Sequence, residues 1–328
     1  MSKGQYDHTA HRAAASGRAT QRREEVFTGT GLDPMLDPKY RGYRESLRVG
    51  VYPKARPIMV ALDETGSMGH IPHFLATDAH RGLPGMVKGL YPFVADPQIC
   101  FVGIGDARCQ EDAPIQLGHF EGEGHKMDEW LTKLYLENGG GGNGGESYEL
   151  GLYAGARCVR ADAFRDGDRG YHFTVGDDNL FSEVRAIDIQ ERFGVRIEDD
   201  IATEAIMAEL VANWHPFFIC PDPGRAGHHE ANWRRYFGDH VIIAHSHEDI
   251  AVLLCGVVGL TEGTLTDLDV FDRLLAESFE RQDPRERGRV ITVLEAYAAV
   301  LGRAGGSRPA AASEPTAGSR KSGNVRHA

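Results

Sequence analysis

Three polar side chains, each two residues from the next, follow a run of apolar residues early in the chain. Asp63, Thr65 and Ser67 come directly after residues 57–62 (PIMVAL), and Gly66 permits a tight turn through which alternate side chains can point to one centre. Carboxylate and hydroxyl oxygens are hard ligands, which suit Mg²⁺ or Mn²⁺ better than zinc or copper. The segment therefore favours a divalent cation site. The same residues also fit a helix cap by the aspartate, with hydroxyls that satisfy loop amides.

A second acidic segment has the same form. Asp177 and Asp178 follow the apolar residues 171–175 after a single glycine. In open α/β sheets, ligands bind in the crevice beyond the carboxyl ends of the strands. Two strand ends that each deliver a carboxylate therefore strengthen the prediction of a cation site, and a pair of helix caps is the alternative.

A glycine-rich segment lies between two helical patterns and forms the third candidate loop. Residues 139–145 contain six glycines in seven positions, interrupted only by Asn143 and followed by Glu146 and Ser147. Such a stretch can be a flexible linker, but its place between helices favours a loop in which backbone closely approaches another group. Asn143 or Ser147 could supply a further oxygen to a cation. Glu146 is interpreted as a charge favoured by the dipole of the following helix.

The elements that must position these loops alternate along the chain. Apolar runs typical of strands buried on both faces are followed by helix-length segments. Strands that alternate with helices form right-handed crossovers and a parallel sheet covered on both faces. We therefore expect an α/β fold with a doubly wound, mostly parallel sheet and added C-terminal helices. Strands are predicted at 57–62, 99–104, 115–120, 171–175, 216–220 and 240–244, and helices at 74–90, 127–136, 147–159, 181–193, 201–214, 248–258, 265–279 and 289–301.

Composition and charge divide the chain into four parts. Residues 1–50 are polar and basic (net +3) and are predicted to be an irregular arm. Residues 51–260 form the predicted sheet domain, and 261–303 the C-terminal helices. Residues 304–328 are rich in Gly, Ser, Ala and Pro, so we expect a disordered tail. The net charge is −12, and the segment 303–328 carries +4, which leaves −19 for the middle of the chain.

These properties exclude several classes of function. An acidic body repels nucleic acid phosphates and favours cations or basic partners. No apolar run approaches the length of about 18 residues that would span a membrane. The five cysteines are odd in number and scattered, which is typical of free thiols in a reducing compartment, so a cytoplasmic location is expected.

Taken together, the three loops resemble those of the von Willebrand factor A-like (vWA) family, of the bacterial or phage type, with its metal-ion-dependent adhesion site. The first loop of that family reads Asp-x-Ser/Thr-x-Ser, matched here by Asp63, Thr65 and Ser67. Its third loop presents an aspartate after a strand, matched by Asp177. The second loop normally offers a threonine, which is absent here. The segment GGGGNGGES is closer to the glycine-rich, acid-containing loop of bacterial relatives.

The resemblance extends over residues 56–244 and implies a Rossmann-like fold with a cation that is not catalytic. The protein would bind Mg²⁺ (or Mn²⁺) and leave one coordination position open for a carboxylate of a protein partner. Stand-alone bacterial members often work with AAA+ ATPases of the MoxR type, which makes such an ATPase the expected partner. The expected ligands are Asp63, Thr65, Ser67, Asn143, Ser147 and Asp177.

An enzyme is the main alternative. The segment DETGS also resembles the phosphorylated loop of haloacid dehalogenase-like phosphotransferases, and residues 176–179 (GDDN) resemble their Mg²⁺ loop. Asp63 would then be a nucleophile that attacks phosphorus. Thr65 stands where most soluble members have a second aspartate, and this alternative gives no reason for the glycine-rich loop. A non-enzymatic adaptor is therefore the favoured prediction.

A zinc site is the other alternative. No C-x-x-C or H-E-x-x-H motif accompanies the histidines, and adjacent histidines in a strand or helix point apart. They are interpreted as loop or surface residues. The histidines concerned are His228, His229, His245 and His247.

Overall fold

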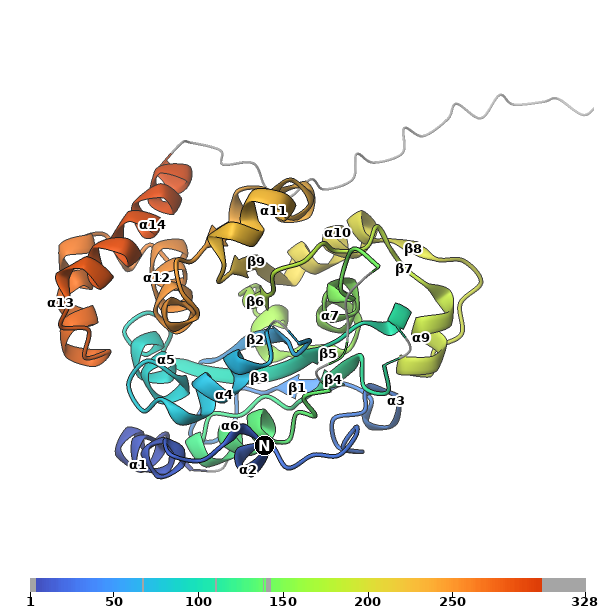
Figure 1. Ribbon diagram of the computed structural model, residues 1–328, viewed down its shortest axis with the longest axis horizontal. Coiled ribbons are helices and arrows are strands. Elements are labelled where there is room, and N and C mark those ends of the chain that lie inside the picture. Colours follow the sequence, from blue (N-terminus) through green and yellow to red (C-terminus); the bar gives the residue numbers. More distant parts are fainter. Residues whose placement is uncertain (1–3, 67, 110, 138, 140–142, 303–328) are drawn as a thin grey trace, which may run out of the picture.

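The computed structural model describes residues 4–302 except 67, 110, 138 and 140–142. Its centre is a six-stranded sheet in the order β10-β9-β6-β2-β3-β4 (Figure 1). Neighbouring strands are parallel, except that β4 runs antiparallel to β3. This order, with the first strand in the middle, is that of a doubly wound sheet and confirms the predicted fold class. The strands are β2 (Ala55–Asp63), β3 (Asp96–Ile104), β4 (Ile115–Leu117), β6 (Gly170–Val175), β9 (Trp214–Cys220) and β10 (Val241–Ile243).

The central strand β2 is apolar throughout because helices cover both faces of the sheet. Ile58, Val60 and Leu62 belong to the hydrophobic core on one face, and Met59 and Ala61 to the core on the other. A strand with both faces buried needs apolar side chains at every position, and this explains the continuous run in the sequence.

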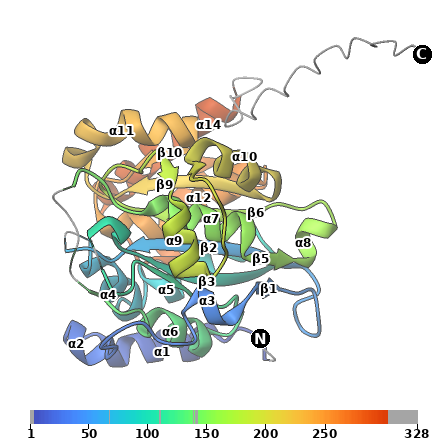
Figure 2. The ribbon, with the colours of Figure 1, turned by 90° about the vertical axis from the view of Figure 1, so that its right-hand side faces the viewer.

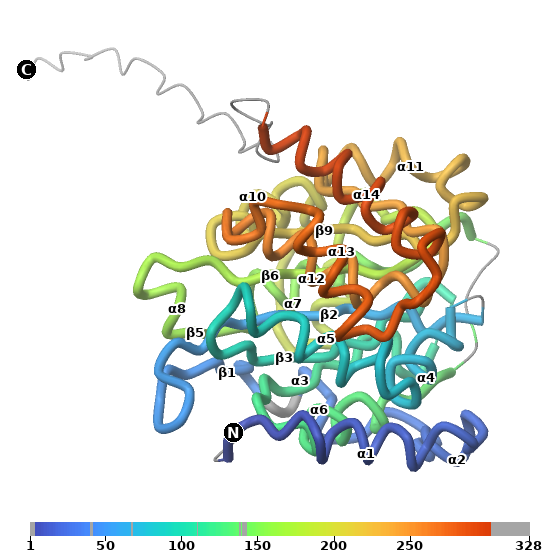
Figure 3. Tube along the Cα trace, turned by 90° about the vertical axis from the view of Figure 1, so that its left-hand side faces the viewer, coloured from blue at the N-terminus to red at the C-terminus, as the bar shows by residue number. Residues whose placement is uncertain are grey.

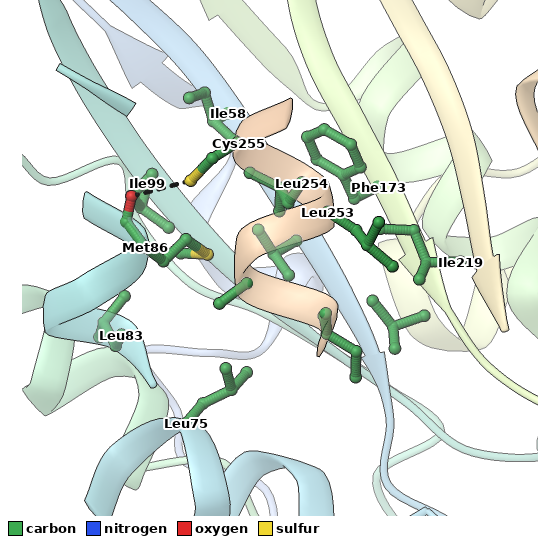
Figure 4. Packing of buried hydrophobic residues seen from close by; sticks show 14 of the residues in the cluster. Ile58, Leu75, Leu83, Met86, Ile99, Phe173, Ile219, Leu253, Leu254 and Cys255 are labelled. Atoms are coloured by element: carbon green, nitrogen blue, oxygen red, sulfur yellow. Dashed lines mark hydrogen bonds between the residues drawn. The ribbon is translucent and has the colours of Figure 1, made fainter. Parts of the chain in front are cut away.

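Helices also cover the first face of the sheet, which Figure 3 shows from this side. The most buried of these is α12 (Ile250–Thr261), whose residues 250–259 are all buried. Figure 4 shows Leu253 and Leu254 of this helix among side chains of the sheet, and the Cys255 thiol donates to the Met86 carbonyl oxygen at 3.3 Å. The other helices are α4 (His70–Thr77), α5 (Leu83–Leu90), α6 (Gly124–Thr132), α13 (Leu268–Ser278) and α14 (Pro284–Gly302).

The second face is covered by α7 (Tyr148–Arg157), α9 (Ala186–Phe193), α10 (Thr203–Asn213) and α11 (Pro223–Phe237), as Figure 2 shows. The sequence did not predict α11, because only four of its residues are buried and most of the others are polar or charged. Its N-terminus is fixed by Asp222, whose side chain accepts from the backbone nitrogens of Gly224 and Arg225. A short antiparallel pair, β7 (Glu183–Val184) and β8 (Ile201–Ala202), lies on either side of α9 in the chain.

The helix predicted at 74–90 is in fact two helices, α4 and α5. Asp78 ends the first, and Pro84 lies in the first turn of the second. A Cβ at Gly82 would lie 2.4 Å from the Asp78 carbonyl oxygen, so the chain turns at a position where only glycine fits. This break allows the chain to reverse directly after the first candidate loop.

The prediction of an irregular N-terminal arm was wrong. Residues 4–50 contain α1 (His8–Arg18), α2 (Arg23–Val26), α3 (Pro38–Arg41) and β1 (Arg44–Ser46), and β1 pairs with β5 (Val159–Ala161). Helix α1 packs on α4, α5 and α6. Its apolar face is so small that the pattern was missed: His11 and Ala15 are its buried residues, and His11 Nε2 lies 3.2 Å from Asp128 Oδ1.

The predicted tail 304–328 lies outside the described residues. The division of the chain at 50, 260 and 303 stays a prediction. None of the helices between residues 4 and 302 combines the length and apolarity of a membrane span.

Candidate cation site at the carboxyl edge of the sheet

The first loop begins where β2 ends. Asp63 is its last residue and is only 1% exposed. Its Oδ1 accepts hydrogen bonds from the backbone nitrogen of Thr65 at 2.9 Å and from the Thr65 hydroxyl at 2.6 Å, so the carboxylate organises the turn that follows it. The Gly66 nitrogen donates to the Gly139 carbonyl oxygen at 3.1 Å, which places the start of the glycine-rich loop against the first loop. Ser67 lies outside the described residues.

Tyr148, the first residue of α7, joins the first loop to the third. Its hydroxyl donates to Asp63 Oδ2 at 2.5 Å and accepts from the backbone nitrogens of Asp177 and Asp178 at 3.2 and 3.3 Å. A Cβ at Gly176 would lie 2.4 Å from the Tyr148 ring, so glycine is required before the acidic pair. The structure therefore brings the ends of β2 and β6 together through one buried hydroxyl.

The electrostatics of this pair favour a positive charge. Burial, with a smaller contribution from the nearby charge of Asp177, raises the pKa of Asp63 to about 6, although hydrogen bonds from Thr65 and Tyr148 act in the opposite direction. Asp177 is 5% exposed, and its carboxylate has Arg225 as a basic neighbour, whose Nε lies 3.5 Å from Oδ2. A buried carboxylate whose pKa is raised by burial and by a neighbouring carboxylate is stabilised in its charged form by a nearby cation.

The two weaker sequence candidates contact the loop that follows β3. Ser147 is fully buried, and its hydroxyl accepts from the backbone nitrogen of Ala107 at 3.0 Å. Asn143 donates through its side-chain nitrogen to Asp106 Oδ2 at 2.5 Å. Each side chain therefore has a structural partner of its own. Their predicted role as cation ligands stays a prediction.

Four further buried acids lie at this edge, and none of them was predicted from the sequence to belong to the cation site. All are at least nine-tenths buried, and three of them have a buried side-chain oxygen without a hydrogen-bond partner among the described residues. Two of them carry a signal in the sequence. Asp106 follows the apolar run of β3 after a single glycine, and Glu64 is the immediate neighbour of Asp63. The four are Glu64, Asp106, Glu111 and Glu146, of which Glu64, Glu111 and Glu146 have the unpartnered oxygen.

Glycines in the adjacent backbone make room for these acids. A Cβ at Gly105 would lie 2.0 Å from Glu111 Oε2, and a Cβ at Gly103 would lie 2.6 Å from Glu64 Oε2. The other oxygen of Glu64 accepts from the Gln116 side chain at 2.6 Å. Burial raises the pKa of Glu111 to about 7 and that of Glu146 to about 10, and nearby carboxylates contribute to both shifts.

This donor set fits a hydrated Mg²⁺ better than a fully caged metal. Among the described residues, no three Asp, Glu, His or Cys side chains are placed to hold one ion directly, which gives the histidine-based zinc alternative no support. Mg²⁺ is usually held by one or two carboxylates and keeps several of its waters. Asp63 and Asp177 supply two carboxylates, and Thr65 supplies a hydroxyl.

Comparison with known proteins gives a likeness of fold. No family model and no curated protein matches the chain. Similar solved structures include proximal thread matrix protein 1 from the mussel byssus, with 10% identity and a TM-score of 0.42 over 63% of this chain and 48% of that one. A von Willebrand factor type A structure from Catenulispora acidiphila has 12% identity and a TM-score of 0.37 over 64% of this chain and 43% of that one.

The SpRpn10 VWA domain is a third such neighbour, with 10% identity and a TM-score of 0.34 over 61% of this chain and 94% of that domain. The chain thus has vWA domains among its neighbours in fold. At these identities and TM-scores the likeness is one of fold alone, and nothing about the site follows from it.

Proposed function

We propose that this protein binds one divalent cation, Mg²⁺ or Mn²⁺, between Asp63 and Asp177 and uses it to capture an acidic group of a protein partner. The observation that carries the proposal is the pair of buried acids at two neighbouring strand ends: the Tyr148 hydroxyl donates to the Asp63 carboxylate and accepts from the backbone nitrogen of Asp177. Thr65 and Ser67 would complete the protein's share of the ligands. A carboxylate of the partner would occupy the remaining position of the ion.

The residues of this chain have separate tasks in such a site. Asp63 and Asp177 supply the negative charge that attracts the ion. Tyr148 fixes one oxygen of Asp63 through a hydrogen bond and leaves further lone pairs of that carboxylate for a cation. Thr65, held against the other oxygen of Asp63, keeps the first loop in its turn. When bound, the cation supplies a positive centre that can accept an oxygen ligand from another protein.

The geometry around Asp63 favours this adhesion-type role over phosphoryl transfer. A nucleophilic aspartate needs an accessible oxygen in line with the phosphorus atom. Asp63 is 1% exposed, and each of its oxygens already accepts a hydrogen bond, at 2.5 to 2.9 Å. We therefore propose a non-enzymatic protein. A MoxR-type AAA+ ATPase is the proposed partner, on the basis of the family resemblance of the loops alone.

Calorimetric titration of Mg²⁺ and Mn²⁺ into EDTA-treated protein tests the proposal. We expect saturable binding in the wild type, loss of binding in Asp177→Ala and Ser67→Ala, and unchanged binding in Asp112→Ala, which removes an exposed acid. A phosphatase assay with p-nitrophenyl phosphate on the same samples tests the alternative. Metal-dependent phosphate release that requires Asp63 would contradict the adaptor role and identify a phosphotransferase.

A further inference from the structure

Glu146 is fixed at the meeting point of the loops that surround the proposed cation. Its backbone nitrogen donates to the Asn179 carbonyl oxygen at 3.0 Å, in the loop that follows β6. The nitrogen of the next residue, Ser147, donates to the Gly105 carbonyl oxygen at 3.1 Å, at the end of β3. The end of the glycine-rich loop is therefore tied on both sides, and the Glu146 side chain is 3% exposed.

The Glu146 carboxylate differs from the other buried acids of this edge because it has no donor. Its Oε2 is buried, and its side chain makes no hydrogen bond with a described residue. Glu64 accepts from Gln116, and Glu111 accepts from the Asp106 nitrogen at 2.6 Å. A buried carboxylate without any donor loses its hydration without compensation.

The charged groups that act on Glu146 are all acidic. Asp63 has the strongest effect, followed by Asp106, Glu111 and Asp178. The two polar side chains that the sequence suggests for this loop, Asn143 and Ser147, have partners elsewhere. Glu146 is thus the acid of the glycine-rich loop, its carboxylate has no donor among the described residues, and Asp63 has the largest effect among the charged groups that act on it.

We propose that Glu146 is the group of the glycine-rich loop that supports the cation bound at Asp63 and Asp177, and that it does so by holding a water molecule of that cation. It would take the place of the threonine that the resembled family has in this loop. This inference rests on the proposed function. A water-mediated contact agrees with the finding that no three acidic, His or Cys side chains among the described residues can hold an ion directly. It also agrees with the preference of Mg²⁺ to keep part of its hydration shell.

The test measures Mn²⁺ and Mg²⁺ affinity by calorimetry in the wild type, Glu146→Gln and a matched control. The control is Glu149→Gln, which removes another buried carboxylate of the same helix region, one whose neighbours are Arg108, Asp188 and Asp106. We expect the dissociation constant of Glu146→Gln to rise about 10–100-fold, the usual effect of losing a group that supports a metal's ligands. The affinity of Glu149→Gln should stay within about twofold.

Thermal unfolding with and without cation separates this role from a structural one. In EDTA, Glu146→Gln should unfold at about the same temperature as the wild type or at a higher one, because an amide of the same shape replaces a buried carboxyl group that has no donor. In saturating Mg²⁺, the variant should gain less stability than the wild type. A variant that is destabilised in EDTA but binds Mn²⁺ with unchanged affinity would overturn the inference.

The failure of this inference can be distinguished from the failure of the proposed function. If the wild type binds neither ion, both are overturned. If the wild type binds and Asp177→Asn does not, but Glu146→Gln binds as the wild type does, then only the role of Glu146 is overturned.

Discussion

Asp249 and Asp63 are both about 1% exposed, yet their surroundings differ. Asp249, just before α12, lies against the buried Arg281 at 2.5 Å and against Arg289 at 3.6 Å. Asp63 forms no ion pair with a described residue, and the charges that act on it are those of other acids. The buried acid Asp249 is thus neutralised by arginines of the chain itself. At the carboxyl edge Asp63 has no such partner among the described residues, and the proposed function assigns that place to a cation from outside.

A second structural pair follows the same rule on the N-terminal side. Asp128 of α6 is met by Arg18 at 2.8 Å and by His11 at 3.2 Å, both from α1. A buried ion pair contributes little net stability, but removal of one partner leaves an uncompensated charge. Neutralising a charge should therefore have opposite consequences in the two places. It should destabilise the protein where a buried acid is paired with an arginine, as at Asp249, but not at the carboxyl edge, as at Asp177.

The largest effect is expected at Arg281. The change Arg281→Met leaves Asp249 buried without its main partner and should lower the free energy of unfolding by about 3–5 kcal/mol. Denaturant unfolding of the two proteins measures this. Arg234→Met, which breaks an exposed pair with Glu230, is the control and should cost at most about 0.5 kcal/mol. Equal effects of the two changes would contradict the structural role of the Arg281 pair.

A pH-dependent effect is expected at His172, a buried base of β6 that has no acidic partner among the described residues. Burial lowers its pKa from 6.5 to about 4, so the unfolded chain takes up a proton in this range before the folded protein does. The stability that His172 contributes is therefore complete above pH 6.5 and is lost as the pH falls toward 4, by about 3 kcal/mol.

His172→Gln removes this titration. Urea unfolding of the EDTA-treated proteins at pH 7 and pH 4.5 should show a larger loss of stability for the wild type than for the variant. The same pH dependence in both proteins would show that His172 is not the buried base that the structure describes.

A smaller effect is expected at Tyr148. Tyr148→Phe leaves the backbone nitrogens of Asp177 and Asp178 without their shared acceptor and should lower the free energy of unfolding by about 1–3 kcal/mol. Tyr236→Phe is the matched control, because Tyr236 is a buried residue whose hydroxyl makes no hydrogen bond with a described residue, and it should change stability by less than about 0.5 kcal/mol. Similar stabilities of the two variants would contradict the role of Tyr148 as the link between the loops.

Much of the fold could be predicted because buried parallel strands carry a local signal. The apolar runs that form β2, β3, β6 and β9 were recognised within a few residues. The positions of Asp63 and Asp177 followed from those runs, since parallel strands end at one edge. The two loops could therefore be placed together before any contact was known.

The parts that were missed depend on contacts that a local pattern does not contain. Helices α1 and α11 bury few residues and so show little apolar periodicity. Tyr148 belongs to an apolar stretch and resembled a core residue, although its hydroxyl joins two loops. Glu146 was interpreted as a favourable charge at a helix start. Its burial without a donor became visible only once three loops were assembled around it.

The central claim is that the carboxyl edge binds a cation through Asp63 and Asp177. Thermal unfolding of the wild type and of Asp177→Asn, each in EDTA and in saturating Mg²⁺, tests it most directly. We expect Mg²⁺ to raise the unfolding temperature of the wild type and not that of the variant, because an ion that binds only the folded state stabilises the folded state. We also expect the variant in EDTA to be at least as stable as the wild type. An unfolding temperature of the wild type that does not respond to Mg²⁺ or Mn²⁺ would contradict the claim.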